Sequence, residues 1–205
     1  MNILAFGAHP DDIELGCAGT LIKYAQGGHQ VYLCVMSDGS KAGDAHARTQ
    51  EQEEAGKRLG AKELIWGPCI DAEFSVNQGT IQFIESVVEK VQPDEIYVNY
   101  HNDSHQDHRA LAQCVAAATR YQKRVLYYED YTSQKFEPEI FVDISDVLDQ
   151  KIQVMNSFQS QIKRSAPSGP NMEAGIRAIA NFRGFQAKID YAEGFKALRY
   201  LKNAN

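Results

Sequence analysis

The sequence predicts an α/β fold in which helices cover both faces of a mainly parallel sheet. Short β-prone apolar segments alternate along the chain with longer segments of helical periodicity, and no internal repeat or low-complexity stretch interrupts them. Strands separated by helices are typical of parallel sheets, because each helix carries the chain back across one face of the sheet. We therefore expect a Rossmann-like three-layer sandwich that forms a single domain, residues 1–205.

Six segments have the composition of strands. Each is short and rich in branched or aromatic apolar residues, and most are flanked by Gly, Pro, Asp or Asn. The predicted strands are residues 2–7, 30–37, 62–66, 94–100, 124–129 and 140–144.

Two segments show clear helical periodicity. Residues 79–91 carry apolar side chains at helical spacing, namely Ile81, Ile84, Val87, Val88 and Val91. Residues 145–162 repeat this pattern, with Ser145 as the expected N-cap, through Leu148, Ile152, Met155, Phe158 and Ile162. The segment that follows, residues 163–171, contains prolines and a glycine and is expected to be a surface loop.

Composition excludes several classes of function. The chain has 27 acidic and 21 basic residues and a net charge of −6, whereas binding to nucleic acid or an anionic membrane generally depends on a basic face. Its four cysteines lack CxxC spacing, which favours buried thiols in a reducing compartment. No segment approaches the ~18 apolar residues of a membrane span. We therefore expect a cytoplasmic protein with neither nucleic-acid nor membrane partners.

Two polar clusters follow predicted strands. The sequence HPDD occupies residues 9–12, after the strand at 2–7, and HQDH occupies residues 105–108, after the strand at 94–100. Ligands of open parallel sheets bind beyond the carboxyl ends of the strands, where the strand order reverses. If these two strands are parallel neighbours, both clusters contribute to one metal site.

The residue types in the clusters suit metal-dependent hydrolysis. His9 and Asp12, with Pro10 as the expected first helical residue, can present a nitrogen and an oxygen to one point. Such a site needs three ligands, an open position for water and an unligated base, and two adjacent aspartates can supply a ligand and the base. Of His105 and His108, one can complete the ligand set while the other faces the reacting group. Asp107 can orient an imidazole by a hydrogen bond.

Structural explanations compete with this interpretation. Asp11, Asp12 and Glu14 are acids that a helix dipole favours in the first turn. The second cluster would be a solvated loop, with Asp107 as the cap of a helix at 109–119. However, four of the six histidines, at positions 9, 101, 105 and 108, lie in or beside the two clusters, together with aspartates. This concentration favours the metal site.

The two clusters also resemble the signature motifs of a known family. HPDDIELGCAG at 9–19 and HQDHR at 105–109 are similar to those of the PIG-L/LmbE-like zinc-dependent deacetylases of N-acetylglucosaminyl compounds. Weaker matches extend over most of the chain, including SDG at 37–39, RxxE from Arg48 and YAEGF at 191–195. The sequence departs from the family pattern at Gln106, where proline is usual, and at Ala18, where glycine is common.

The resemblance implies specific roles for these residues. His9, Asp12 and His108 would ligate the metal, with Zn²⁺ expected and Fe²⁺ able to occupy the same ligands. Asp11 would act as the general base on a metal-activated water, and His105 would lie near the developing oxyanion.

Three further residues complete the predicted site. We expect Asp107 to be one of the catalytic residues, and we expect Arg48 and Asp103 to bind substrate. The rest of the substrate would be recognised by loops at 38–47, 71–77, 131–138 and 163–171.

The expected substrate is a small acetylated amino sugar, either N-acetylglucosamine itself or a glycoconjugate of it. Homo-oligomers are common in the family, so a homo-oligomer is also expected. Two alternatives remain open. A two-His, one-carboxylate ligand set also suits Fe(II) oxygenases, whose turnover would need oxygen. A sugar- or nucleotide-binding module would use the histidines as polar lining without any reaction.

Overall fold

The computed structural model describes residues 1–165 and 171–202. In this part of the chain, seven strands form one sheet in the order β3-β2-β1-β4-β5-β7-β6. The strands are β1 (Asn2–Gly7), β2 (Gln30–Val35), β3 (Glu63–Trp66), β4 (Glu95–Asn99), β5 (Arg124–Tyr128), β6 (Ile140–Asp143) and β7 (Ala192–Tyr200). The first five in this order are parallel neighbours, and β7 runs antiparallel to both β5 and β6.

Helices connect most of the strands. They are α1 (Asp12–Gln26), α2 (Ala45–Leu59), α3 (Gln78–Val91), α4 (Gln106–Ala118), α5 (Leu148–Met155), α6 (Gln159–Ser165) and α7 (Met172–Ala187). A short 3₁₀ helix, Ser40–Ala42, lies between β2 and α2.

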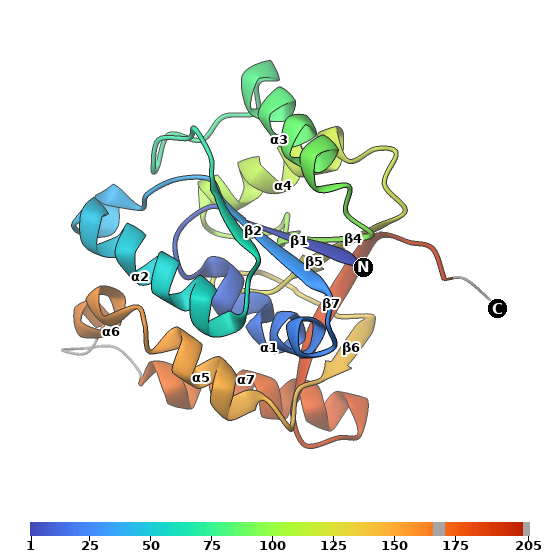
Figure 1. Ribbon diagram of the computed structural model, residues 1–205. Helices are drawn as coiled ribbons and strands as arrows, with labels where there is room; N and C mark the ends of the chain where they lie inside the picture. The colour runs from blue at the N-terminus through green and yellow to red at the C-terminus, as the bar shows by residue number, and fades with distance from the viewer. Residues whose placement is uncertain (166–170, 203–205) are drawn as a thin grey trace.

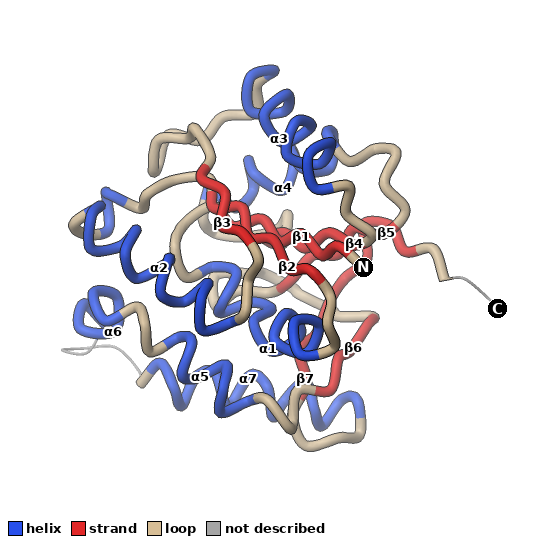
Figure 2. Tube along the Cα trace, in the orientation of Figure 1, coloured by secondary structure: helices blue, strands red, loops and turns tan. Residues whose placement is uncertain are grey.

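The helices form two layers with the sheet between them, as Figures 1 and 2 show. Helices α3 and α4 cover one face, while α1, α2, α5 and α7 lie on the other. Each layer has its own apolar core against the sheet, with Ile84 and Leu111 in one core and Leu21 and Ile152 in the other. The predicted α/β fold with a mainly parallel sheet is confirmed.

All six predicted strands are present. The first and third end at the expected residue, and the other four end one or two residues earlier. The seventh strand, β7, was missed. Its sequence AEGFKALRY contains charged residues, alanines and a glycine, which are depleted in strands, so its composition gives no clear strand signal. Hydrogen bonds to β5 on one side and to β6 on the other stabilise this segment as a strand, although its composition does not favour one.

The predicted helix at 79–91 matches α3, which begins one residue earlier with Asn77 as its N-cap. The single helix expected at 145–162 is wrong, because the chain forms α5 and α6 with a turn between them. Asn156 and Ser157 occupy this turn, and both residue types compete with helical hydrogen bonds. Ser145 is not the cap of α5; its hydroxyl instead donates to Asp143 Oδ1 at 2.7 Å.

Strands β1 and β4 are parallel neighbours, with Ile3 opposite Glu95 and Phe6 opposite Val98. From β1 the sheet extends through β2 to β3 on one side, and through β4 to β5 on the other. The strand order therefore reverses between β1 and β4. The segments that follow these two strands meet at the carboxyl edge of the sheet, where a binding crevice is expected.

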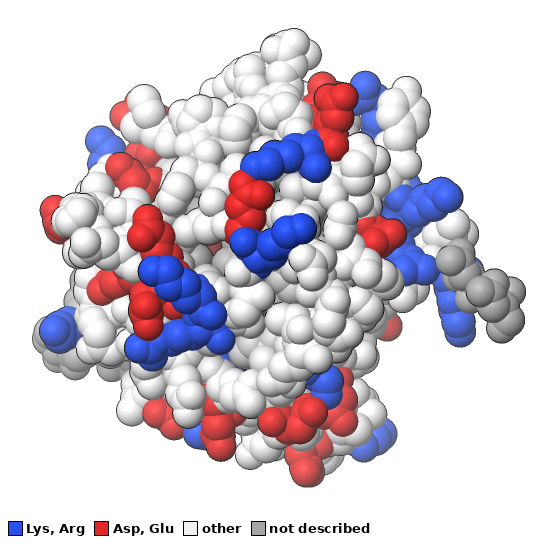
Figure 3. Space-filling view, in the orientation of Figure 1, with Lys and Arg blue, Asp and Glu red and all other residues white. Residues whose placement is uncertain are grey.

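The surface has no strongly basic character on the face drawn in Figure 3, where basic and acidic side chains are interspersed. None of the helices in the described part of the chain combines the length and apolar composition that a membrane crossing requires. The surface loop predicted at 163–171 is wrong for residues 163–165, which end α6, and residues 166–170 lie outside the described residues. The single domain over residues 1–205 stays a prediction.

Candidate active site

The HPDD motif forms the turn between β1 and α1. Asp11 is the N-cap of α1 and has φ 93°, a left-handed conformation that Asp tolerates better than most residues. Asp12 is the first helical residue, so the expectation that Pro10 begins the helix is wrong. The turn separates the two carboxylates. The Asp12 side chain is 5% exposed and accepts the His9 backbone N–H at 3.0 Å, while the Asp11 side chain is 23% exposed.

The HQDH motif begins α4. His105 is the N-cap, and its Nδ1 accepts the backbone N–H of Asp107 at 3.3 Å. The alternative in which Asp107 caps a helix at 109–119 is therefore wrong, because Asp107 already lies in the first turn. One turn into the helix, His108 is 3% exposed and directs its Nε2 to Asp12 Oδ2 at 3.3 Å.

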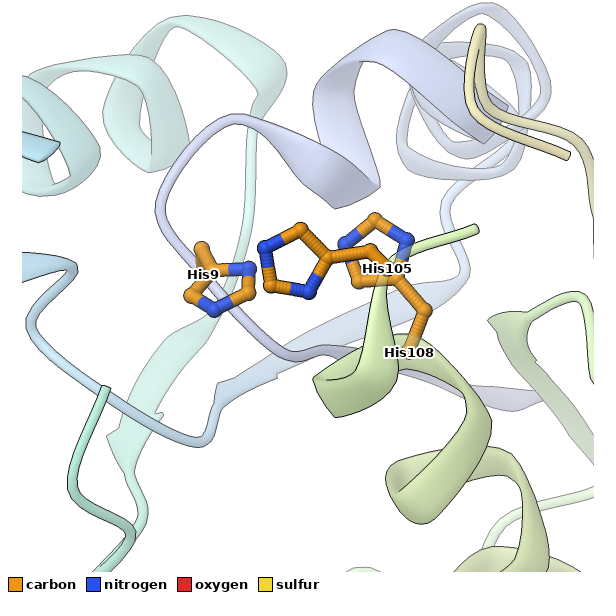
Figure 4. Close-up of side chains that lie close together, drawn as sticks. All are labelled: His9, His105 and His108. Atoms are coloured by element: carbon orange, nitrogen blue, oxygen red, sulfur yellow. The ribbon is translucent and has the colours of Figure 1, made fainter. Parts of the chain in front are cut away.

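The histidines of the two motifs lie together, as Figure 4 shows. The ring centroid of His105 is 4.7 Å from those of both His9 and His108, and the His9 and His108 centroids are 5.5 Å apart. His9 comes from the segment after β1, and the other two come from the start of α4. Residues nearly one hundred positions apart in the sequence thus form one cluster.

Each buried imidazole lies between carboxylates. His9 Nδ1 is 3.6 Å from Asp12 Oδ2, and its Nε2 is 3.0 Å from Asp107 Oδ2 and 3.2 Å from Asp71 Oδ1. His108 Nε2 faces Asp12, while its Nδ1 is 3.4 Å from Asp103 Oδ2. Asp12 is therefore shared by both rings, and each ring has a second carboxylate on its other nitrogen.

These contacts shift the titration of the cluster. Burial lowers the pKa of His9, but hydrogen bonds with Asp107, Asp12 and Asp71 outweigh it and raise the pKa to about 12. For His108, burial is likewise outweighed, chiefly by the charge of Asp12 and a hydrogen bond with Asp103, and the pKa rises to about 10. Burial opposes ionisation of Asp12, yet His108 and His9 hold its pKa well below the usual range.

The pKa values of Asp11 and His105 shift in the opposite directions from those of Asp12 and of the other two histidines. Burial, followed by the negative charge of Asp12, raises the pKa of Asp11 to about 7, although Arg48 and His9 act against this rise. Burial, followed by the charges of His108 and His9, lowers the pKa of His105. Near neutral pH, Asp11 can therefore exchange a proton, and His105 is the least basic imidazole of the three.

A cavity of about 470 Å³ opens at this cluster. The segments expected to recognise substrate at 38–47, 71–77 and 131–138 each contribute to its wall. The lining residues are His9, Asp11, Asp12, Lys41, Ala42, Arg48, Asp71, Ala72, His105, Tyr131 and Gln161. This volume lies within the usual range for small-molecule sites.

Arg48 and Asp103 lie at the site but make mainly internal contacts. Arg48 is 3% exposed and donates from its guanidinium to the carbonyls of Gly39 at 2.9 Å and Pro10 at 2.7 Å. One of its nitrogens is also 3.6 Å from Asp11 Oδ2. Asp103 accepts the His105 backbone N–H at 2.8 Å. Both residues thus hold the two motifs in place, and their contact with substrate stays a prediction.

Sequence reasoning missed two carboxylates of the site. Asp71 follows β3, contacts His9 and accepts the Lys41 backbone N–H at 2.7 Å. Asp130 lies just beyond β5 and is 6% exposed, and burial together with Asp12 raises its pKa to about 8. Each is an isolated aspartate without motif context. The available signal was position alone, because both follow strands of the same parallel sheet.

The donor atoms are arranged to receive a cation. In the described part of the chain, three groups have ligand atoms within 4.8 Å of one another. These groups are His9–His105–His108, His9–Asp71–Asp107 and Asp12–His108–Asp130. They overlap at His9 and His108, so the cluster as a whole is a candidate metal centre.

A mainly parallel sheet with helices on both faces and a buried His/Asp cluster at its switch point defines an α/β protein with a candidate metal site in its crevice. The family model described as PIG-L, GlcNAc-PI de-N-acetylase, matches residues 4–119, from β1 to the end of α4. The chain therefore belongs to the PIG-L family.

Two relatives support this assignment by sequence. The uncharacterized deacetylase YaiS of Escherichia coli (strain K12) is 34% identical over 154 residues, which span 71% of this chain and 83% of that protein. The diacetylchitobiose deacetylase of Thermococcus kodakarensis is 25% identical over an alignment of 223 positions, which covers 95% of this chain and 82% of that protein.

Solved structures share the fold at lower identity. The conserved protein TT1542 from Thermus thermophilus has a TM-score of 0.89 and 23% identity, covering 98% of this chain and 96% of that chain. GalB, the 4-carboxy-2-hydroxymuconate hydratase from Pseudomonas putida, has a TM-score of 0.85 and 21% identity, covering 100% and 98%. The name of the first gives no activity, and the second is named as a hydratase and not as a deacetylase. The fold alone therefore leaves the reaction open.

Proposed function

We propose that the protein is a metal-dependent N-deacetylase that removes the acetyl group from an N-acetylglucosamine-type sugar or glycoconjugate. The observation that carries the proposal is the contact of both His9 and His108 with Asp12 Oδ2, at 3.6 and 3.3 Å, beside a cavity that His9, Asp11 and Asp12 line. The names of the relatives by sequence support the reaction class, because both are deacetylases. They also support a substrate built on N-acetylglucosamine, since one of them is named for diacetylchitobiose.

The donor set fits a zinc ion. Two imidazoles and one carboxylate are a common ligand set for catalytic zinc, and they leave a position for water and substrate. Metal-ligating imidazoles usually bond a carboxylate or carbonyl through their second nitrogen. Asp107 on His9 and Asp103 beside His108 match this pattern. We propose His9, Asp12 and His108 as the ligands and Asp107 as the residue that orients His9, and Fe²⁺ suits the same donors.

A bound zinc ion would lower the pKa of a water molecule toward ~7 and polarise the acetamide carbonyl. The residues around it then manage protons. Asp11 lines the cavity, and its raised pKa suits a base that takes a proton near neutral pH and returns it to the leaving amine. Arg48 keeps Asp11 in place from one side, through its contacts with the carboxylate and with the Pro10 carbonyl.

His105 is proposed to stabilise the oxyanion as a hydrogen-bond donor. Because its Nδ1 accepts the Asp107 backbone N–H, the neutral ring carries its hydrogen on Nε2. A neutral ring fits the lowered pKa of His105. His105 lines the cavity, so its ring would border the space in which we propose that the substrate binds.

The test is acetate release from N-acetylglucosamine, diacetylchitobiose and larger conjugates. The purified protein is assayed as isolated, after chelation, and after one equivalent of Zn²⁺ or Fe²⁺ is restored, with and without oxygen. We expect anaerobic acetate release that chelation abolishes and metal restores. A need for oxygen would replace the proposal with the Fe(II) oxygenase, and sugar binding without any bound metal or reaction would replace it with the binding module.

A further inference from the structure

Helix α1, which begins with Asp12, is interrupted one turn later. Cys17 has φ −146° and ψ 15°, values outside the helical region, so the regular hydrogen-bond pattern is broken there. The interruption falls inside the GCAG part of the first signature motif, residues 16–19. The first turn of α1, which presents Asp12 to the site, is therefore a separate short segment with its own orientation.

A buried ion pair occupies the interruption. Lys151 of α5 donates to the Leu15 carbonyl at 2.7 Å and to Glu193 Oε1 at 2.6 Å. Glu193 of β7 accepts the backbone N–H groups of Gly19 at 2.8 Å and Thr20 at 2.7 Å. In an unbroken helix the Gly19 N–H would bond the Leu15 carbonyl. Here the Lys151 ammonium donates to the carbonyl that ends the first segment, and the Glu193 carboxylate accepts the N–H groups that begin the second. Each charge also has the sign that the dipole of its helical segment favours.

Both residues of the pair are buried, since Lys151 is 4% exposed and Glu193 is 5% exposed. Buried ion pairs generally contribute little to stability, because desolvation offsets their attraction, and apolar replacements are often at least as stable. Stability is therefore a weak explanation for two charges at this place. A defined geometry for the broken helix is a better one, because this pair supplies both a donor and two acceptors to the interruption.

The first turn is also held from the sheet side. A side chain on Gly16 would approach Tyr128 Cδ2 to 2.1 Å, so only glycine allows the helix this close to β5. The Tyr128 hydroxyl shares its one proton between the Phe6 carbonyl at 2.8 Å and Asn99 Oδ1 at 3.0 Å, and Asn99 Nδ2 donates to Asp12 Oδ2 at 3.3 Å. Contacts thus run from the interruption to the carboxylate that both histidines share.

We propose that the Lys151–Glu193 ion pair is the positioning element of the metal centre: it sets the interruption in α1 and thereby the orientation of Asp11 and Asp12. Both residues lie beyond residue 119, where the match to the family model ends. The C-terminal part of the chain therefore completes a site whose predicted ligands all come from the N-terminal part. The functional half of this proposal rests on the proposed function, since it takes Asp12 as a ligand.

The experiment uses Glu193→Gln, Lys151→Met, the double variant and the charge swap, which combines Lys151→Glu with Glu193→Lys. Glu95→Gln is the matched control, because Glu95 is another buried carboxylate that accepts two hydrogen bonds. One of these comes from Tyr24 in the last turn of α1, so the two variants are compared at the Gly19 and Thr20 amides, which Glu95 does not contact. Two quantities are measured on folded protein: amide hydrogen exchange along α1, and zinc affinity by competition with a chelator. Exchange needs no metal, so it tests the interruption even where the proposed function fails.

In Glu193→Gln we expect the Gly19 and Thr20 amides to exchange about tenfold faster, because a charge-assisted hydrogen bond is lost. Zinc affinity should fall about 10- to 100-fold, as for other residues that orient metal ligands. The charge swap should rescue neither quantity, since it places an ammonium against two N–H groups. If the single variants do not fold, the uncharged double variant provides the same two measurements.

The proposal is overturned if Glu193→Gln, or the double variant in its place, changes both quantities no more than Glu95→Gln does. Rescue of both by the charge swap would also overturn it, because an ion pair of either polarity would then suffice. A wild-type protein that binds no zinc would refute the proposed function, and exchange along α1 would then decide the positioning role by itself.

Discussion

Buried carboxylates lie at both ends of the parallel strands, the amino edge and the carboxyl edge of the sheet. Their hydrogen-bond partners differ between the two edges. At the amino edge, Glu95 is the first residue of β4 and is 3% exposed. It accepts hydrogen bonds from the hydroxyls of Tyr24 at 2.9 Å and Tyr97 at 2.5 Å. At the carboxyl edge, Asp12 and Asp107 share imidazoles with further carboxylates. Asp107 Oδ1 is buried and has no hydrogen-bond partner in the part of the chain that the structure describes.

The difference separates a structural carboxylate from a functional one. Neutral hydroxyl donors surround Glu95 without competition from other acids. At the carboxyl edge, several carboxylates contact the same imidazoles. The pKa values of His9 and Asp11 are raised there, while that of the neighbouring Asp12 is lowered. Burial of an acid is therefore weak evidence for a site, whereas crowding of opposed titratable groups is strong evidence.

The largest expected effect comes from His9→Ala, paired with Glu95→Gln at the other edge. His9 contacts Asp12, Asp71 and Asp107, so its loss removes a proposed ligand and leaves these carboxylates without their shared partner. We expect the variant to lose stoichiometric metal and all measurable deacetylation, while Glu95→Gln keeps both and loses only stability. Metal analysis of the purified variants measures this directly. One retained metal ion per chain in His9→Ala would remove His9 from the ligand set.

Asp11→Asn should produce a smaller loss of a different kind. Asparagine tolerates the left-handed conformation at φ 93°, so the turn should persist, and Asp11 is not among the proposed ligands. We expect an unchanged metal content and a kcat lowered about 10²- to 10⁴-fold, the usual range for a lost general base. Steady-state kinetics at matched metal content test this prediction. Turnover near the wild-type value would show that another group takes the proton.

Much of this organisation was predictable because it depends on local signals. The strands from β1 to β6 have apolar runs that indicate them, and the two polar motifs follow the strands on either side of the switch point. Reversal of strand order then brings the motifs together without any further information. The amino-edge environment of Glu95 was not predictable, because its tyrosine partners lie on α1 and β4 without a recognisable spacing.

What the sequence did not predict depends on tertiary contacts. Strand β7 is stabilised by neighbours on both sides and not by its own composition. Asp71 and Asp130 enter the site only because their strands end at the same edge. The left-handed Asp11 and the interruption at Cys17 arise where one segment must satisfy both the helix and the site. Local preference is overridden at each of these positions.

Proton release on metal binding gives a further test of the crowded edge. His9 and His108 have pKa values of about 12 and about 10, so both are protonated in the metal-free protein near pH 7. A metal ion binds neutral imidazole, so it must displace both protons. We expect about two protons released per zinc ion, and an affinity that rises about 100-fold per pH unit while both remain protonated. Calorimetry in buffers of different ionisation enthalpy measures this number.

The metal-free protein should respond to pH with the opposite sign. A histidine whose pKa is raised on folding stabilises the fold below its unfolded value of 6.5, and this contribution is lost as pH rises through its folded value. Above pH 6.5, thermal stability should therefore fall with pH without metal and become nearly independent of pH at saturating zinc, because neither the unfolded chain nor the zinc-bound protein then holds these two protons. Glu95→Gln should retain both trends. Parallel trends with and without zinc would mean that the two imidazoles do not hold the metal.

The smallest expected effect concerns Gln106, which lies at the carboxyl edge but contributes only to the helix. It is the exposed first residue of α4, where the backbone N–H has no partner within the helix and proline is favoured. The preceding His105 has φ −77° and ψ 121°, an extended conformation that a following proline prefers. Gln106→Pro should therefore leave metal affinity unchanged and raise the free energy of unfolding by about 0.4–1 kcal/mol, measured by chemical denaturation. A loss of zinc affinity would instead show that the geometry of His105 and His108 depends on freedom at the start of α4.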